Sequence, residues 1–333
     1  AGKRLTWNII VDNQLSVSPM TSYSPPSITA LIGTNVNNAS VSGGDIIKLI
    51  GENFGPSNAY ELYGRHFLEK VTYGPSGSEY TATNCKVISN LEITCQTVAG
   101  VGALLFWELT VAGQTSELSS ITMSYASPFI LSMTPNTAST DGTTKITLTG
   151  LNFAVETLPK LYFGGKLISS FSEGINQLQF YVPIAISVVS TTYPVYIIVG
   201  GQQSNVVNFQ YTPPHIDTVN SLDSGNNTVT LSILGSSFSL SPIVTILPSD
   251  STTSITPYCY KILHNEIICS ITIRAGNVTV KTGVSSSNTV YFQFGEPLLI
   301  LSSLTSGQAL TNGYTLQNHA QLYIVGQNFG ISS

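Results

Sequence analysis

Charged residues are scarce in this 333-residue chain, where Asp, Glu, Lys and Arg together make up 9% of the sequence. An ordinary soluble domain contains roughly 25% of them. The net charge is −5, and like charges do not gather in runs. The composition therefore provides no basic surface for nucleic acid and no polybasic segment for an anionic membrane. With so few charges, we expect solubility to depend on hydroxyls, amides and attached sugars.

Long apolar runs and helical patterns are also missing. The longest apolar stretch, Leu178–Gly200, is interrupted by Pro183, Pro194 and polar residues between them. It predicts two buried strands joined by a turn, and not a membrane span. The first residues have no apolar core of the length that a signal peptide needs, so we expect any signal or anchor to lie outside this sequence. No window of twelve or more residues has helical periodicity, which favours an all-β fold.

Signatures of catalysis and of metal binding are absent as well. The sequence has neither a G-x-S-x-G elbow nor an H-E-x-x-H helix, and Gly100-Val-Gly102 precedes a strand pattern instead of a helix. Acidic residues are too sparse for a calcium cage. The four histidines, which zinc would need near cysteines, are scattered: they are His66, His215, His264 and His319. We expect no enzyme activity, no metal and no cofactor apart from covalent glycans.

What the chain does contain is a repeat of about ninety residues. A short apolar strand runs into Gly-x-(Asn/Ser)-Phe four times, with the first glycines 99, 85 and 91 residues apart; the sites are Gly51–Gly55, Gly150–Phe153, Gly235–Phe238 and Gly326–Gly330. A second marker, an aromatic strand end followed by Pro-x-(Ile/Leu), keeps the same period, starting at Tyr23, Tyr125, Tyr211 and Phe294. Two independent markers with one period establish an internal repeat.

Each repeat is predicted to be an antiparallel sandwich. Between the markers, short alternating runs are broken by Gly, Pro, Asn and Ser, which is typical of strands and hairpin turns. About seven short strands in ninety residues indicate a sandwich of immunoglobulin type. The fold class is therefore all-β, with tandem immunoglobulin-like sandwiches joined by short links that contain proline.

The four cysteines form two matched pairs, Cys85/Cys95 and Cys259/Cys269, with C-x₉-C spacing at equivalent points of two repeats. In a hairpin centred between them, the two cysteines face each other within bonding reach. Disulfides are favoured over metal ligands or free thiols, and they indicate an oxidising compartment, outside the cell or on its surface.

The strand–Gly-x-Asn-Phe-Gly signal, the cysteine pair and the Trp-x-(Leu/Ile)-x-Val strand followed by Gln resemble IPT/TIG domains. These are the immunoglobulin-like modules of plexins, Met-type receptors, some transcription factors and many cell-surface proteins. The resemblance implies residues 1–24 as the last strands of a preceding or shared domain, complete domains at 25–126, 127–212 and 213–295, and residues 296–333 as the first strands of a following or shared domain. The second repeat departs from the pattern because it has no cysteine, and Ala154 and Ser239 replace the second motif glycine.

Three sequons, beginning at Asn38, Asn226 and Asn277, predict N-glycosylation. Unused sequons in a chain rich in Ser, Thr and Asn are the alternative.

The first residues match the end of the first complete repeat. Leu5–Ile28 aligns with Leu105–Ile130, and the pairs include the only two tryptophans, Trp7 and Trp107. We expect Trp7, Ile9 and Val11, with Tyr23, to belong to the inward face of a shared sandwich, opposite the tail residues Leu322, Ile324 and Phe329. Either the sequence is a window of a longer tandem chain, or successive subunits exchange strands head to tail. In both cases the expected partner is the protein itself.

The preferred function is an extracellular stalk, filament or adhesive surface of glycosylated sandwiches. The alternative is a receptor ectodomain that recognises a protein or a glycan at the cell surface through loops of the first complete domain; its candidates are Tyr60, Tyr63, Arg65, His66, Phe67 and Lys70. A carbohydrate-binding module comes third, because it would need exposed stacked aromatic rings and both tryptophans are placed in strands.

Overall fold

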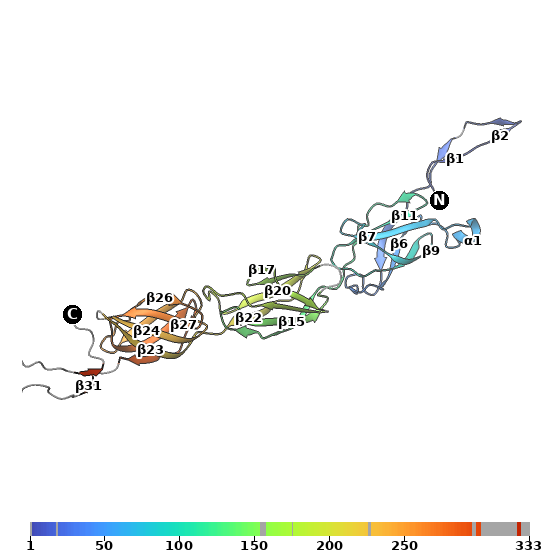
Figure 1. Cartoon of the computed structure of the whole chain (residues 1–333). Helices are drawn as coiled ribbons and strands as arrows, with labels where there is room; N and C mark the ends of the chain where they lie inside the picture. The colour runs from blue at the N-terminus through green and yellow to red at the C-terminus, as the bar shows by residue number, and fades with distance from the viewer. Residues whose placement is uncertain are drawn as a thin grey trace, which may run out of the picture. The chain divides into compact units, whose positions relative to one another are not determined.

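The computed structural model describes residues 2–17, 19–153, 158–174, 176–225, 228–294, 298–300 and 325–327 (Figure 1). Strands dominate these residues, as the sequence predicts, and they form antiparallel sandwiches with short connections. The all-β, immunoglobulin-like fold class is confirmed. No helix in these ranges is long and apolar enough to cross a membrane.

Sandwich 1 covers the first complete repeat. Its elements are β5 (Ser27–Ile32), β6 (Ile46–Glu52), α1 (Ala59–Tyr63), β7 (Leu68–Gly74), β8 (Tyr80–Thr81), β9 (Thr83–Ser89), β10 (Glu92–Gln96), β11 (Phe106–Val111) and β12 (Gln114–Thr115). They form two sheets with the orders β5-β6-β10-β9 and β12-β11-β7-β8. Alternate residues of β6 and β11 face the core, and Trp107 stacks on Tyr73 with ring centroids 4.4 Å apart.

Sandwich 2 has the same order of first strands. Its elements are β13 (Phe129–Thr134), β14 (Thr137–Ala138), β15 (Lys145–Leu151), β16 (Lys160–Phe163), β17 (Lys166–Ile168), β18 (Ser172–Gly174), β19 (Gln177–Tyr181), β20 (Tyr193–Val199), β21 (Gln202–Gln203) and β22 (Val207–Tyr211). One sheet has the order β13-β15-β19-β18, and the other contains β14, β22, β20, β16, β17 and β21. The apolar stretch from Leu178 to Gly200 forms β19 and β20, which confirms two strands.

Sandwich 3 is built in the same way. Its elements are β23 (His215–Gly225), β24 (Thr228–Ser236), β25 (Ile243–Pro248), β26 (Tyr258–Ile262), β27 (Glu266–Ile271), β28 (Ala275–Thr282), β29 (Ser285–Ser286) and β30 (Val290–Gln293). One sheet has the order β23-β24-β27-β26, and the other joins β25, β28, β29 and β30.

Four short strands precede sandwich 1, and one further pair follows sandwich 3. The first group is β1 (Leu5–Thr6), β2 (Ile10–Val11), β3 (Gln14–Leu15) and β4 (Met20–Thr21), where β1 pairs with β4 and β2 with β3. The last pair is β31 (Leu298–Ile300) with β32 (Val325–Gln327). We call residues 5–23 the head hairpin.

The register of the first two strands is the same in every repeat. The residue pairs are Ile28–Gly51, Ile130–Gly150, Ile216–Gly235 and Leu299–Gly326. In the three sandwiches, a Cβ on the motif glycine would collide with the main-chain carbonyl oxygen of Ser27, Phe129 or His215. Only glycine allows the opposite strand to approach so closely, which is why the repeat marker contains it.

The chain divides into two compact units, and the division passes through sandwich 2. One unit consists of residues 1–134, 146–180 and 194–208, and the other of residues 135–145, 181–193 and 209–333. The predicted domain boundaries stay a prediction.

Both predicted disulfides are present. Cys85 is bonded to Cys95 and Cys259 to Cys269, and no cysteine of the described residues is free. Each bond joins the two strands of a hairpin, β9–β10 or β26–β27, as the spacing indicates.

The connection from β6 to β7 contains the five-residue helix α1, which is too short to show a helical period and is compatible with the absence of longer helical patterns in the sequence. One expectation about local structure is wrong. Trp7 is placed in a strand by the sequence, but it lies between β1 and β2, outside either strand. Trp107 pairs with Tyr73 of β7, whereas the described residues provide Trp7 with no such neighbouring strand.

Candidate functional site: the link clamps and the head hairpin

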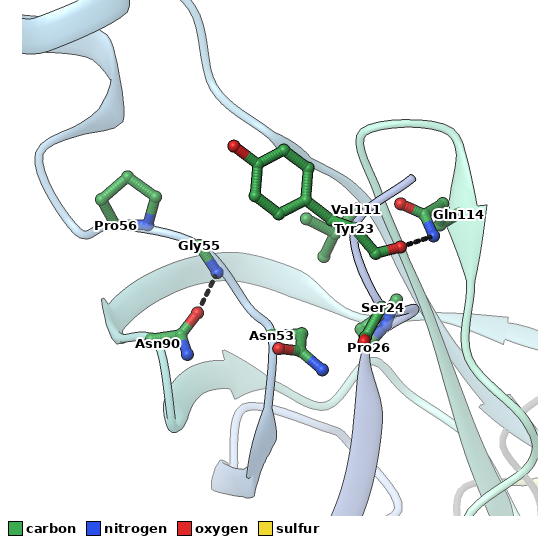
Figure 2. Close-up of a pocket in the computed structure, with 9 residues that line it drawn as sticks. All are labelled: Tyr23, Ser24, Pro26, Asn53, Gly55, Pro56, Asn90, Val111 and Gln114. Atoms are coloured by element: carbon green, nitrogen blue, oxygen red, sulfur yellow. Dashed lines mark hydrogen bonds between the residues drawn. The ribbon is translucent and has the colours of Figure 1, made fainter. Parts of the chain in front are cut away.

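The link that enters sandwich 1 is held by two side-chain amides (Figure 2). Gln114 Nε2 donates to the carbonyl oxygen of Tyr23 at 2.8 Å, the bond drawn as a dashed line in Figure 2. Asn53 Nδ2 donates to the carbonyl oxygen of Pro25 at 3.0 Å. The two amides line a small pocket of about 190 Å³ beside Tyr23 and Pro26. The link is therefore bonded to the sandwich on two sides.

The same pair of bonds recurs at the link that enters sandwich 2. Gln202 Nε2 donates to the carbonyl oxygen of Tyr125 at 3.0 Å and to Ser127 Oγ at 3.1 Å. Asn152 Nδ2 donates to the carbonyl oxygen of Ser127 at 2.9 Å. We call each set of amide bonds a link clamp. Net stabilisation of about 0.5–1.5 kcal/mol is typical for one such hydrogen bond.

Local backbone geometry explains why these residues hold the links. Asn53 and Asn152 have φ of 63° and 60°, in the left-handed region that asparagine tolerates better than most residues. In the next position Phe54 and Phe153 are fully buried. One tight turn therefore places an aromatic ring in the core and an amide on the link.

In sandwich 3 the equivalent position is held by hydroxyl groups. Ser237, with φ of 58°, lies 2.6 Å from Thr212 through their hydroxyl oxygens. Thr140 Oγ1, which is fully buried, accepts from the main-chain N–H of Ser239 at 3.2 Å and lies 2.8 Å from His264 Nδ1. All of these residues belong to the second compact unit.

The Thr140 contact favours neutral His264. Thr140 Oγ1 already accepts from Ser239, so its own hydroxyl hydrogen can be donated to His264 Nδ1, provided that Nδ1 carries no proton. Burial lowers the pKa of His264, and the nearby carboxylate of Asp141 opposes that shift in part. Burial and the hydrogen bond with Thr140 thus both favour the neutral form of His264.

The head hairpin has the same internal hydrogen bonds as the hairpin β11–β12 and its equivalents β20–β21 and β28–β29, which we call closing hairpins. Ser16 Oγ accepts from the N–H of Ile9, and the N–H of Ser16 donates to the carbonyl oxygen of Ile9. The same two bonds join Ser116 with Leu109, Ser204 with Ile197 and Ser287 with Val280. The turn residues Asp12 and Asn13 have positive φ, as do Ala112 and Gly113 in sandwich 1, so the hairpin turns match as well.

The apolar face of the head hairpin is exposed. Trp7, Ile9 and Val11 are 61%, 64% and 65% exposed, whereas their counterparts Trp107, Leu109 and Val111 are at most 2% exposed. Tyr23 is 60% exposed, whereas Tyr125 is buried and bonded through its hydroxyl to Tyr73. Within the described residues, nothing covers this face as the core covers its equivalents. The expected partners Leu322, Ile324 and Phe329 lie outside the described residues.

The predicted glycosylation sites fall in two settings. Asn38 is exposed in the turn between β5 and β6, and Asn277 is exposed on β28. Asn226 lies outside the described residues. Occupancy of the three sequons stays a prediction.

The loop candidates of sandwich 1 do come together. Tyr60 and Tyr63 are 62% and 60% exposed on α1, and Tyr60 stacks on His66 with ring centroids 5.2 Å apart. Tyr63 contacts Phe67, and the guanidinium of Arg65 lies over the ring of Phe67. Lys70 is exposed on β7. In the described part of the chain, no three His, Cys, Asp or Glu side chains are grouped as a metal site would need.

The family comparison agrees with this architecture. The IPT/TIG domain family matches residues 128–212, which contain sandwich 2. The chain is therefore a tandem immunoglobulin-like protein. Its middle sandwich matches the IPT/TIG domain family, and the other repeats share the register of its first two strands.

Solved structures with similar folds include other tandem proteins. The extracellular region of plexin A4 is 18% identical over 74% of this chain and 21% of its own, with a TM-score of 0.28. A structure determined with a xylogluco-oligosaccharide is 14% identical over 85% of this chain and 67% of its own, with a TM-score of 0.38. A tandem of titin domains is 12% identical over 82% of this chain and 97% of its own, with a TM-score of 0.29. The chain thus spans about a fifth of the plexin region.

Loss of a clamp should loosen its link. Gln202→Ala removes the bonds to Tyr125 and Ser127, and at about 1 kcal/mol per bond we expect amide hydrogen exchange in residues 124–130 to rise about fivefold or more. The control is Gln203→Ala, whose side chain is exposed on the same strand. Equal exchange in the two variants would show that Gln202 does not hold the link.

Acidification should weaken the contacts of Thr140. The pKa of His264 is lower in the folded protein than the value of about 6.5 in the unfolded chain. The stability that neutral His264 contributes to the fold is therefore complete above the unfolded pKa and is lost as the pH falls through the folded pKa. We expect the unfolding temperature of sandwich 3 to drop between pH 7.5 and 5. His264→Gln, which keeps an acceptor for Thr140, should reduce this drop, while His215→Gln should not. The same pH profile in all three proteins would contradict this role.

Proposed function

We propose that this chain is part of an extracellular array of IPT/TIG sandwiches that acts as a stalk, filament or adhesive surface. The recurrence of the same link clamp at two successive links supports this role best. A protein that only presents one binding loop does not need every link bonded to the sandwich it enters. An array that bears load or sets a distance does, because bending concentrates at its links.

The covalent chemistry of the chain supports an extracellular compartment. Two disulfides persist in an oxidising environment and are rare in the cytosol. A chain with 9% charged residues has few ionic groups to keep it soluble, and sugars on exposed asparagines would supply hydration. We propose a glycosylated protein at the cell surface or outside the cell, without catalytic activity or a resident cofactor.

The proposed partner is another sandwich of the same type, either in a longer tandem chain or in a second copy. The head hairpin has the serine bonds and the turn of a closing hairpin but an uncovered face. In sandwich 1 the equivalent strand β11 pairs with β7, and Trp107 stacks on Tyr73. We infer that the head hairpin closes a sandwich that offers a free strand equivalent to β7.

Glycans are expected on protein isolated from the cells that make it. Peptides containing Asn38, Asn226 and Asn277 should carry N-linked sugar, and glycosidase treatment should lower the mass accordingly. If all three asparagines were unmodified, the proposal of a glycosylated surface protein would be wrong.

The two tryptophans allow a direct test of the proposed partner. In the isolated chain, iodide should quench the emission of exposed Trp7 but not that of buried Trp107. In the native assembly Trp7 should also be protected, because a neighbouring sandwich covers it. A Trp107→Phe variant isolates the Trp7 signal. Equal quenching of Trp7 in the isolated and native states would exclude a closing role for the head hairpin.

A further inference from the structure

A cleft of about 550 Å³ lies in sandwich 1, between β9 and the connection that contains α1. Four consecutive residues of β9, Cys85–Ile88, line one side of it. Phe54, Phe67 and Leu68 line the other side, together with His66. The cleft is thus bounded by the main chain of one strand and by an apolar wall.

β9 is the last strand of its sheet, whose order is β5-β6-β10-β9. Cys85 and Val87 pack against the core, so the alternation of a strand directs Lys86 and Ile88 away from it. The outer edge of β9 has no strand neighbour among the described residues. A free edge of this kind accepts an added strand, and the added main chain then supplies much of the affinity.

Two aromatic side chains of α1 contact residues that line the cleft: Tyr60 contacts His66, and Tyr63 contacts Phe67. Tyr60 and Tyr63 are one helical turn apart on α1, both more than half exposed, and Tyr60 stacks on His66. Exposed tyrosines supply large contact areas at low cost in conformational entropy, and tyrosine is enriched where binding energy concentrates.

The charge in the cleft is opposite to that of the chain. Lys86 and His66 line it, and no carboxylate does, although the chain has a net charge of −5. Lys86 is in no ion pair in the described part of the chain, unlike Lys48, which is paired with Glu92. An unpaired cation beside apolar walls is complementary to a ligand that carries carboxylates.

Sandwich 3 shows that this combination does not follow from the fold. Its equivalent edge strand β26 also exposes tyrosines, Tyr258 and Tyr260, but Lys261 is paired with Glu266 at 2.5 Å. The connection from β24 to β25 runs only from residue 237 to 242, whereas the connection that holds α1 runs from 53 to 67. Of these two sandwiches, sandwich 1 therefore combines the long connection that holds α1 with an unpaired lysine on the edge strand, and sandwich 3 does not.

We propose that this cleft binds an extended acidic segment of a partner protein, which adds as a strand to the free edge of β9. Its carboxylates lie near Lys86 and His66, and its alternate apolar side chains pack against Phe67 and the tyrosines of α1. This recognition site goes beyond the structural role proposed above and does not depend on it.

The test uses the full chain and a fluorescein-labelled seven-residue peptide of alternating glutamate and valine, followed by fluorescence anisotropy. We expect saturable binding, with the dissociation constant raised at least tenfold by Lys86→Glu and by the pair Tyr60→Ser and Tyr63→Ser. The matched control is Tyr258→Ser with Tyr260→Ser, two exposed tyrosines on the equivalent strand of sandwich 3, which should leave binding unchanged.

Two modified peptides test the mode of binding. N-methylation of alternate residues, which removes the N–H groups of one edge, and replacement of glutamate by lysine should each weaken binding at least tenfold. Absent binding of the parent peptide, or binding that no cleft variant changes, would overturn the proposal. Displacement of the peptide by a trigalacturonate that binds more tightly would also overturn it, because the cleft would then be a site for acidic sugars.

Discussion

The turn after the second strand of each sandwich is the constraint on which the rest of the structure depends. Its glycine lets the first strand approach, its phenylalanine is buried, and its Asn or Ser adopts a left-handed backbone. Because the phenylalanine fixes the turn in the core, the neighbouring amide has a fixed position from which to bond the link. Core packing and link geometry are therefore determined by the same four residues, and a substitution there would affect both.

This coupling explains why the joint into sandwich 3 differs chemically. Asn53 and Asn152 bond main-chain carbonyls, whereas Ser237, at the equivalent position, contacts the hydroxyl of Thr212. Thr140 and His264 then supply further hydrogen bonds at the same place. An imidazole titrates near neutral pH, whereas hydroxyls and amides do not, so this joint responds to pH through His264.

The sequence predicts the parts of this architecture that follow from local period or spacing. Alternation identifies the buried faces of β6 and β11, and the C-x₉-C spacing predicts both disulfides. It does not reveal contacts between a side chain and a distant carbonyl, such as Gln114 with Tyr23, because these depend on how the chain folds back. The signal for the serine bonds was present, since Ser16 and Ser116 align, but serine is too common here to stand out. α1 has too few residues for a helical pattern.

The head hairpin has local hydrogen bonds of its own and would gain stability if its exposed face were covered. Its turn geometry and the Ser16 bonds are local and need no core. However, two short strand pairs are marginally stable in water. Fully burying a large apolar side chain contributes about 1.5–3 kcal/mol, so Trp7, Ile9 and Val11 together offer several kcal/mol to a surface that covers them. A hairpin with its shape already formed also loses less conformational entropy on docking than an unstructured segment would. Local hydrogen bonds therefore prepare the hairpin, and in the proposed assembly burial of its exposed face would contribute the free energy for closing another sandwich.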